Sequence, residues 1–233
     1  MKFNTRSLTL LIAALPLVLA ACGNKEPEQR AAFTQFLQTR IVDKPGVRVP
    51  QLSAAEKESF GDYAAQYAVI TDFNTGMSSS VKPLGDVMQK GAMRSLSDIV
   101  ARRDEVKAAR EMLAGMRGAL DTEQAKADAA HAQLKQADDL KVVYDKAFEK
   151  TVTVPANTFK AVFPQVDAAF ASGLQVADFV EKNKGQIEVS GSVVKVQSPA
   201  VQAELNKLLQ GLNNQAKEVK LAQTRLRAVM LGN

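Results

Sequence analysis

Residues 96–150 read LSDIVARRDEVKAAREMLAGMRGALDTEQAKADAAHAQLKQADDLKVVYDKAFEK and contain no proline. A heptad register that starts at Ile99 places apolar residues at twelve of fifteen seam positions, whereas about seven would be expected from the 46% hydrophobic content. The exceptions are Arg102, Glu123 and Lys141. Apolar residues that recur at alternating spacings of three and four lie on one face of a helix. The stretch therefore predicts a very long helix with a packing seam.

The length of this helix depends on whether it is continuous. At a rise of 1.5 Å per residue, an unbroken helix over residues 96–150 would be about 80 Å long. Gly115 and Gly118 are the weakest points of the pattern, since glycine is a poor helix former. Ala127, Ala130 and Ala137 on the seam predict a close approach of two helices.

Helices are also predicted before this stretch. Residues 28–42 form a first helix, and residues 43–52 with Pro45, Gly46 and Pro50 form a loop. Ser53 then begins a second helix, because Ser53 and Glu56 fit a capping box. Ser78–Ser80 and Pro83 mark a break or kink in this second helix. Its apolar stripe is Phe60, Tyr63, Tyr67, Ile70, Phe73 and Met77.

Two further helices are predicted after the long stretch. The Thr-Val-Thr-Val run at residues 151–154 has β character and is followed by Pro155, which disfavours helix before it, so the long helix should end there. The next helix runs to about Asn183, and Pro164 predicts a kink or restart within it. Ser198 and Pro199 begin the last helix as N-cap and first residue.

Residues 186–197 change to a period of two. The sequence alternates around Gly191-Ser192, a pair suited to a type II′ turn. This register pairs Val189 with Val194, Glu188 with Lys195 and Ile187 with Val196, so that the apolar side chains share one face. That face either packs on the helices or meets the strand of a partner or a ligand.

The fold class that follows is mainly all-α. We expect an elongated helical bundle with one very long central helix and a small β-hairpin near residues 186–197. The composition agrees, because the chain has no Trp and only 6% aromatic residues and is rich in helix formers. The helical domain with its hairpin insertion should occupy residues 28–233.

The N-terminal residues indicate export. Lys2 and Arg6 precede a short apolar run at residues 8–19, which fits the h-region of a signal peptide and is too short to span a bilayer. Leu19, Ala20 and Ala21 before Cys22 resemble the bacterial lipobox, which is recognised by the signal peptidase. The resemblance implies a signal peptide over residues 1–21, lipidation of Cys22 and a lipidated tether over residues 22–27. The alternative is an ordinary signal peptide followed by a free structural thiol.

The predicted location is the cell envelope. Gly23 follows Cys22 where enterobacterial lipoproteins retained in the inner membrane carry aspartate. The analogy implies the inner leaflet of the outer membrane, facing the periplasm. Acyl chains on Cys22 would make the membrane a partner. Removing residues 1–21 lowers the formal net charge from +5 to +3, because Lys2 and Arg6 leave with no acid, and this balance gives no reason to expect nucleic acid.

Candidate catalytic residues are few. His131 is the only histidine, and Cys22 is the only cysteine. Asp128, His131 and Asp138 share a helix face at spacings of three and seven, which is compatible with a metal but more typical of the charged flank of a long helix. No hydrolase elbow, P-loop or zinc-protease motif is found. We therefore expect no enzymatic activity, no cofactor and no metal.

Some segments resemble a known family. Residues 29–33 (QRAAF), 36–38 (FLQ), 127–131 (ADAAH) and 134–141 (LKQADDLK), with Pro155, are similar to the YiaF-like family of enterobacterial lipoproteins. The similarity runs from the lipobox to the last helix. The family is a domain of unknown function, so the resemblance supports the prediction of a lipoprotein and gives no activity that could be transferred to this chain.

Three functions fit these observations to different degrees. The favoured hypothesis is a lipid-anchored, non-enzymatic scaffold that binds an envelope protein. The alternative is a binder or carrier of an apolar or cell-wall ligand, in a cavity lined by Phe159, Phe163, Phe170 and Phe179. A cell-envelope hydrolase is the least favoured, because no catalytic set is found. The oligomeric state is left open.

Overall fold

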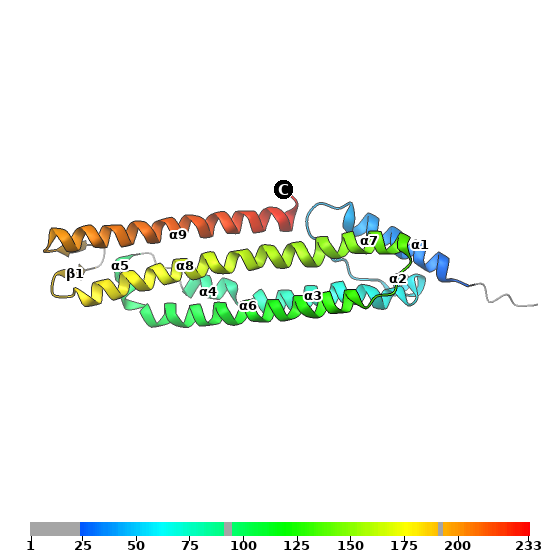
Figure 1. Cartoon of the computed structure of the whole chain (residues 1–233), viewed down its shortest axis with the longest axis horizontal. Coiled ribbons are helices and arrows are strands. Elements are labelled where there is room, and N and C mark those ends of the chain that lie inside the picture. The colour runs from blue at the N-terminus through cyan, green and yellow to red at the C-terminus, as the bar shows by residue number, and fades with distance from the viewer. Residues whose placement is uncertain (1–23, 91–94, 191–192) are drawn as a thin grey trace, which may run out of the picture.

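The chain folds into a long helical rod. The structure is a computed structural model that describes residues 24–90, 95–190 and 193–233. Figure 1 shows helices running along most of the rod, with α1 at one end and the β-hairpin at the other. The predicted fold class, a mainly all-α elongated bundle with a small hairpin, is confirmed.

The first segments carry the predicted helices. Helix α1 (Glu26–Leu37) continues into a π-helical turn, η1 (Gln38–Val42). It begins two residues before the predicted start at residue 28, because Pro27 is tolerated in the first turn of a helix. Residues 43–52 form the predicted loop.

The second predicted helix is divided. The capping box of Ser53 and Glu56 is confirmed and begins α2 (Ala54–Phe60). Gly61, with a φ of 53°, separates α2 from α3 (Tyr63–Val81). The break predicted at Ser78–Ser80 and Pro83 is found at Pro83, before α4 (Leu84–Lys90), while the three serines lie inside α3.

Residues 96–150, whose continuity the sequence left open, do not form one helix. The stretch forms α5 (Leu96–Ala101), α6 (Arg103–Ala132) and α7 (Asp138–Phe148), with a corner at residues 133–137. Neither Gly115 nor Gly118 breaks α6, which runs through both. Tertiary contacts hold the non-helical corner in place: Leu134 packs against the core, and Gln136 Nε2 donates to Gln66 Oε1 at 2.6 Å.

The longest helix lies elsewhere than predicted. From α7, the chain continues through a second π-helical turn, η2 (Glu149–Thr153), into α8 (Val154–Lys182), which gives one helix of 45 residues. The predicted end at residues 151–155 is therefore wrong. In η2 the N–H of Val154 bonds to the carbonyl of Glu149, and this wider turn leaves room for the ring of Pro155. The helix also continues through Pro164.

The hairpin has the predicted register. Strand β1 (Ile187–Ser190) pairs antiparallel with β2 (Val193–Val196), with Ile187 opposite Val196, Glu188 opposite Lys195 and Val189 opposite Val194. The turn at 191–192 lies outside the described residues. The last helix, α9 (Pro199–Leu231), has Ser198 as N-cap and Pro199 in its first turn, as predicted.

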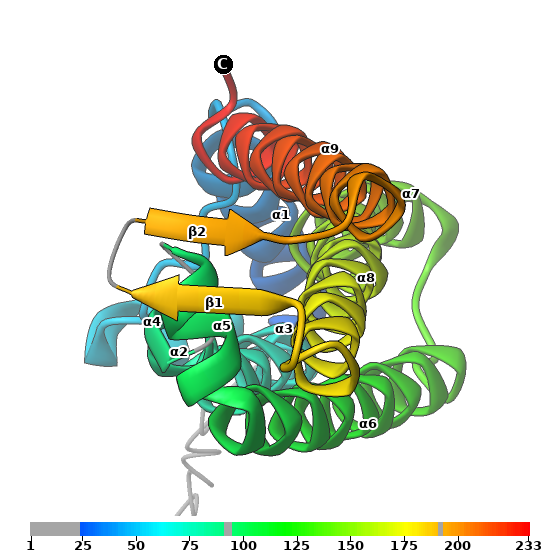
Figure 2. The same ribbon diagram turned by 90° about the vertical axis from the view of Figure 1, so that its left-hand side faces the viewer.

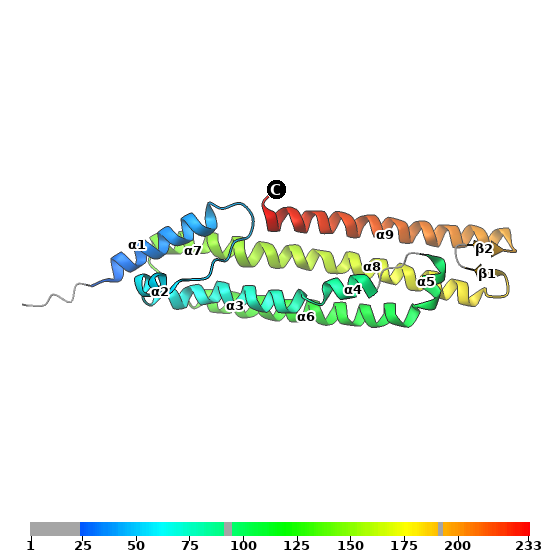
Figure 3. The same ribbon diagram turned by 180° about the vertical axis from the view of Figure 1, so that it is seen from behind.

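Helix α8 lies at the centre of the bundle. Figure 2, viewed along the rod, shows α9 on one side of α8 and α6 on the other, and Figure 3 shows α3 and α4 lying along α6. Two ion pairs join α6 to α8: Arg110 to Asp167 at 2.7 Å and Asp121 to Lys160 at 2.5 Å.

The hydrophobic core has two parts. The larger cluster combines the seam of α6 with apolar residues of α7 and α8 and with aromatic residues of α1, α2 and α3, including Phe33, Phe36 and Tyr67. The smaller cluster lies near the hairpin and includes Ile99, Val176 and Ile187. All residues of both clusters lie between Ala32 and Leu226, so residues 23–233 retain the whole described core.

Candidate functional site

The predicted anchor lies outside the described residues. Cys22 and the preceding Leu19, Ala20 and Ala21 are not described by the structure. The first described residue, Asn24, accepts a hydrogen bond from the N–H of Glu26 at 3.1 Å, so α1 begins almost directly after the predicted anchor. Within the described ranges, no helix combines the length and apolar character needed to cross a bilayer.

The hairpin residues are divided between the core and the surface. Ile187 is buried in the smaller cluster, and Val189 and Val196 pack partly against it. Val194 is 38% exposed, and the neighbouring Val193 is 55% exposed. Glu188 and Lys195 lie 3.7 Å apart on the exposed side. The base of the apolar face is therefore internal, and the residues near the turn are exposed.

His131 has a partner that the sequence analysis missed. His131 Nε2 lies 2.8 Å from Asp145 Oδ1, across the corner between α6 and α7. The imidazole stacks on Phe148 with 4.1 Å between ring centroids. Asp128 and Asp138 are exposed and do not contact it. Over the part of the chain that the structure describes, no three His, Cys, Asp or Glu residues are grouped as metal ligands.

The phenylalanines proposed to line a ligand cavity pack into the core. Phe163 and Phe170 are buried in the larger cluster, and Phe159 packs against it. Phe179 packs against the smaller cluster near the hairpin. Their position along α8 explains the division, since this helix passes from one cluster to the other.

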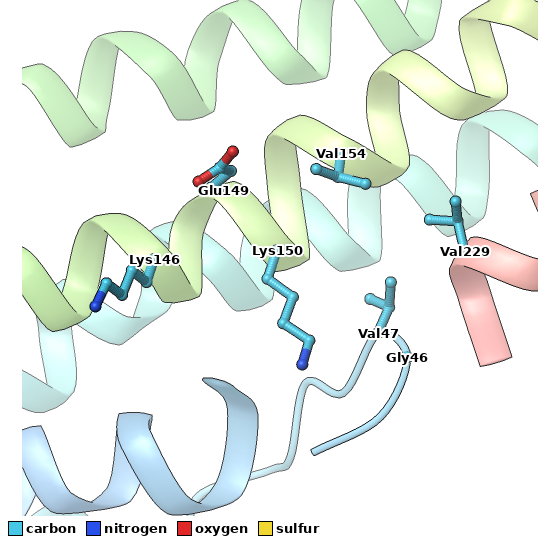
Figure 4. Close-up of a pocket in the computed structure, with 7 residues that line it drawn as sticks. All are labelled: Gly46, Val47, Lys146, Glu149, Lys150, Val154 and Val229. Carbon is cyan, nitrogen blue, oxygen red and sulfur yellow. The ribbon is translucent and has the colours of Figure 1, made fainter. Parts of the chain in front are cut away.

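A groove that the sequence did not predict lies near the C-terminal end of α9. Its first hollow, of about 580 Å³, lies over loop 43–52 and is lined by Arg40, Lys44 and Arg48. Its central hollow, of about 280 Å³, shares Val47 with the first and is lined by Lys146, Lys150, Val154 and Val229 (Figure 4). A third hollow, of about 430 Å³, shares Val229 and lies between α8 and α9. We call these three adjacent hollows the basic groove.

The wall of the groove is held by specific contacts. Lys150 Nζ donates to the carbonyl of Val42 at 2.8 Å and to that of Lys44, at the end of the first helix. A cation is favourable at a helix C-terminus because the free carbonyls carry partial negative charge. The N–H of Val47 donates to the carbonyl of Met230 at 3.1 Å, which joins the loop to the end of α9.

Glycine is required at one position of this wall. Gly46 has a φ of 65°, and a Cβ atom there would lie 2.5 Å from the carbonyl oxygen of Met230. Side chains rarely adopt such a φ, and the distance leaves no room for a methyl group. Gly46 therefore fixes the close approach of the loop and α9.

Several cations of the groove lack an ionic partner. Among the described residues, Lys44, Arg48 and Lys146 form no ion pair. Arg40 lies 3.6 Å from Glu56 and is 52% exposed. The segment KPGVRVP at residues 44–50 is the sequence signal for this feature, because it places cations in a loop stiffened by two prolines. Its approach to α7, α8 and α9 is tertiary and could not be predicted.

The sequence has relatives that place it in a family. Residues 8–227 match the family described as "Protein of unknown function (DUF3053)". The chain belongs to the DUF3053 family.

The curated relatives agree with this assignment. The proteins named "Uncharacterized protein YiaF" from Escherichia coli (strain K12) and Shigella flexneri are each 32% identical to this chain over 219 residues. The match covers 91% of this chain and 92% of each relative. The resemblance to the YiaF-like family is thereby confirmed. No solved structure matches the chain.

Proposed function

We propose that this DUF3053 protein is a lipid-anchored, non-enzymatic scaffold of the cell envelope that binds a protein partner through its hairpin. The supporting observation is the position of the two ends. Helix α1, which follows Cys22 closely, and the hairpin lie at opposite ends of the rod (Figure 1). The helix of α7, η2 and α8 between them is about 68 Å long at the usual rise. A chain anchored at Cys22 would carry the hairpin at the far end from its anchor.

The hairpin has the features of a strand that accepts a partner. Only two strands form its sheet, so the outer edge of β2 has no neighbouring strand among the described residues. Free strand edges pair readily with other strands. Val193 and Val194, beside that edge, are among the exposed large hydrophobic residues of the chain. A partner strand could bond the edge and cover both valines.

A non-enzymatic function is also supported by the chemistry around His131. Its Nε2 is engaged by Asp145, and its ring is covered by Phe148. The side chain is 23% exposed, and the Asp145 bond and the Phe148 stacking join residues on both sides of the corner. We therefore propose that His131 fixes the corner between α6 and α7 and takes no part in catalysis.

Site-specific photo-cross-linking in intact cells tests the scaffold. A photoreactive amino acid would replace Val193 at the hairpin in one variant and Val142 on α7 in the control. Both positions are 55% exposed, so they differ in location and not in accessibility. We expect a discrete cross-linked protein from position 193 and none from position 142. The same cross-link should disappear when Val194→Asp is added. Equal products from both positions, or no product from position 193, would contradict the proposal.

A further inference from the structure

The loop end of the basic groove is suited to an anion. Arg40, Lys44 and Arg48 line the first hollow, and no acidic residue is among its lining residues. Neither Lys44 nor Arg48 has an ion-pair partner within the described ranges, as noted above. The guanidinium groups of arginine bind phosphate through paired hydrogen bonds, and lysine adds a point charge. A phosphate group at this end would supply the missing counter-charge.

The centre of the groove is suited to a hydrocarbon chain. Figure 4 shows Val47, Val154 and Val229 directed toward one another from the loop, α8 and α9. Val154, the first residue of α8, is 38% exposed and lines the central hollow. The third hollow offers Ala161, Val162 and Ala222 as apolar lining and also contains the charged residues Glu218 and Arg225. Glu149 also lines the central hollow, and its carboxylate lies apart from the three valines in Figure 4.

We propose that the basic groove binds one molecule of an acidic phospholipid. Its phosphate lies among Arg40, Lys44 and Arg48, and an acyl chain crosses Val47, Val154 and Val229 toward the groove between α8 and α9. The three cations at the loop end and the three valines at the centre match an amphiphile better than a free anion, which would leave the valines uncovered. The volumes of the hollows are close to those of small-molecule sites, about 300–1,000 Å³.

The groove is formed before the lipid binds. Gly46 and the bond from Val47 to Met230 fix the loop against α9. Lys150 holds the opposite wall through the carbonyls of Val42, at the end of η1, and Lys44, in the loop. A rigid site loses less conformational entropy when its ligand binds, which favours affinity. This proposal is independent of the scaffold function, because it concerns a different surface of the rod.

Titrations with short-chain lipids test the proposal. Residues 23–233, which retain the described core, would be titrated below the micelle concentration with dihexanoyl phosphatidylglycerol. Dihexanoyl phosphatidylcholine and inorganic phosphate are the comparison ligands. Amide shifts in nuclear magnetic resonance spectra would report both affinity and location. We expect one acidic lipid per chain, with shifts at Val47, Val154 and Val229, and about tenfold weaker binding of each comparison ligand.

Two variants and a control identify the groups that bind. Arg48→Glu should lower the affinity for the acidic lipid about tenfold or more, because it removes a phosphate partner and adds a repelling charge. Val154→Asn should lower the affinity for the acidic lipid and leave the weak binding of inorganic phosphate unchanged. The control is Lys182→Glu, at the far end of α8, about 40 Å from Val154 along the helix. It makes the same change in net charge and should leave lipid affinity unchanged.

Each alternative result would overturn the proposal. Equal binding of phosphatidylcholine would mean that the cations do not select the headgroup, and equal binding of phosphate would mean a simple anion site. Equal weakening by Lys182→Glu would mean unspecific charge attraction. Tighter binding of a hexaglutamate peptide than of the acidic lipid would assign the groove to an acidic protein segment. Unchanged melting temperatures of the variants show that a lost affinity is not a lost fold.

Discussion

His131 Nε2 lies 2.8 Å from Asp145 Oδ1, and this bond joins the last turn of α6 to the middle of α7. Lys141 Nζ bonds to the other carboxylate oxygen at 2.6 Å. Burial acts to raise the pKa of Asp145, but the hydrogen bonds from Lys141 and His131 outweigh it, so this pKa lies below its usual value. The carboxylate therefore stabilises the corner in its ionised form.

Replacing this carboxylate should destabilise the protein in a pH-dependent way. A lowered pKa in the folded state means that Asp145 contributes stability above its unfolded pKa, about 3.9, and that the contribution is lost as pH falls through the folded pKa. We expect Asp145→Asn to lower the melting temperature at pH 7, and we expect its difference from the wild type to shrink as pH falls below about 3.9. The control is Asp128→Asn, since Asp128 is exposed and forms no ion pair that the structure describes. An equal effect of both variants at pH 7 would contradict this explanation.

The two ends of the hairpin face should respond differently to a charge. Ile187 is 5% exposed within the smaller cluster, so Ile187→Asp buries an unpaired carboxylate and should cost several kcal/mol. Val194 is 38% exposed, so Val194→Asp should cost less than about 1 kcal/mol. Thermal melts of residues 23–233 would measure both. A large loss from Val194→Asp would show that the exposed end of the hairpin also packs internally.

Two glycines should give changes of opposite sign. Gly46→Ala forces a side chain into a φ of 65° and against the carbonyl of Met230, and should destabilise the protein by about 1–3 kcal/mol. Gly115 lies within α6 with no atom within 4 Å of an added Cβ, so Gly115→Ala should stabilise by about 0.5–1 kcal/mol. Denaturant unfolding would compare them. A neutral Gly46→Ala would mean that the loop can move away from α9.

Cys22 should be the point of attachment to the membrane. Only its thiol can form the thioether of a lipoprotein, since the chain has no other cysteine. We expect Cys22→Ser to leave an uncleaved precursor that no longer incorporates labelled fatty acid. Metabolic labelling and electrophoresis would measure both properties, with Ser53→Ala as an unrelated control. Labelling of the Cys22→Ser variant at the wild-type level would exclude lipidation at Cys22.

The repeating patterns predicted packing faces well. Ile99, Val106, Leu113, Met116 and Leu120 all lie on the predicted seam, and all are buried. The register of the hairpin followed from the alternation of apolar and polar residues on both sides of one predicted turn. These predictions succeeded because a stripe of apolar residues on one face of a helix or strand is buried only when that face is turned toward the core.

The connections between helices were predicted poorly because they depend on distant residues. The corner at residues 133–137 contains neither glycine nor proline, and Gln136 is held there by Gln66. Pro155 indicated an end, but the π-helical turn before it keeps the helix continuous. The basic groove combines residues from η1, the loop, α7, α8 and α9, which no local pattern connects.

The π-helical turn η2 also has a consequence for evolution. A π-helical turn holds about one residue more than an α-helical turn, and each residue rotates a helix by about 100°. Loss of a single residue from Glu149–Thr153 would therefore convert the wide turn into an ordinary α-helical turn and leave the buried face of α7, with Leu140 and Tyr144, directed toward the core that α8 shares. A one-residue deletion inside α7 or α8 would instead rotate one face by about 100° away from that core. Comparison of DUF3053 family members should therefore show one-residue deletions at η2 without compensating changes in α7.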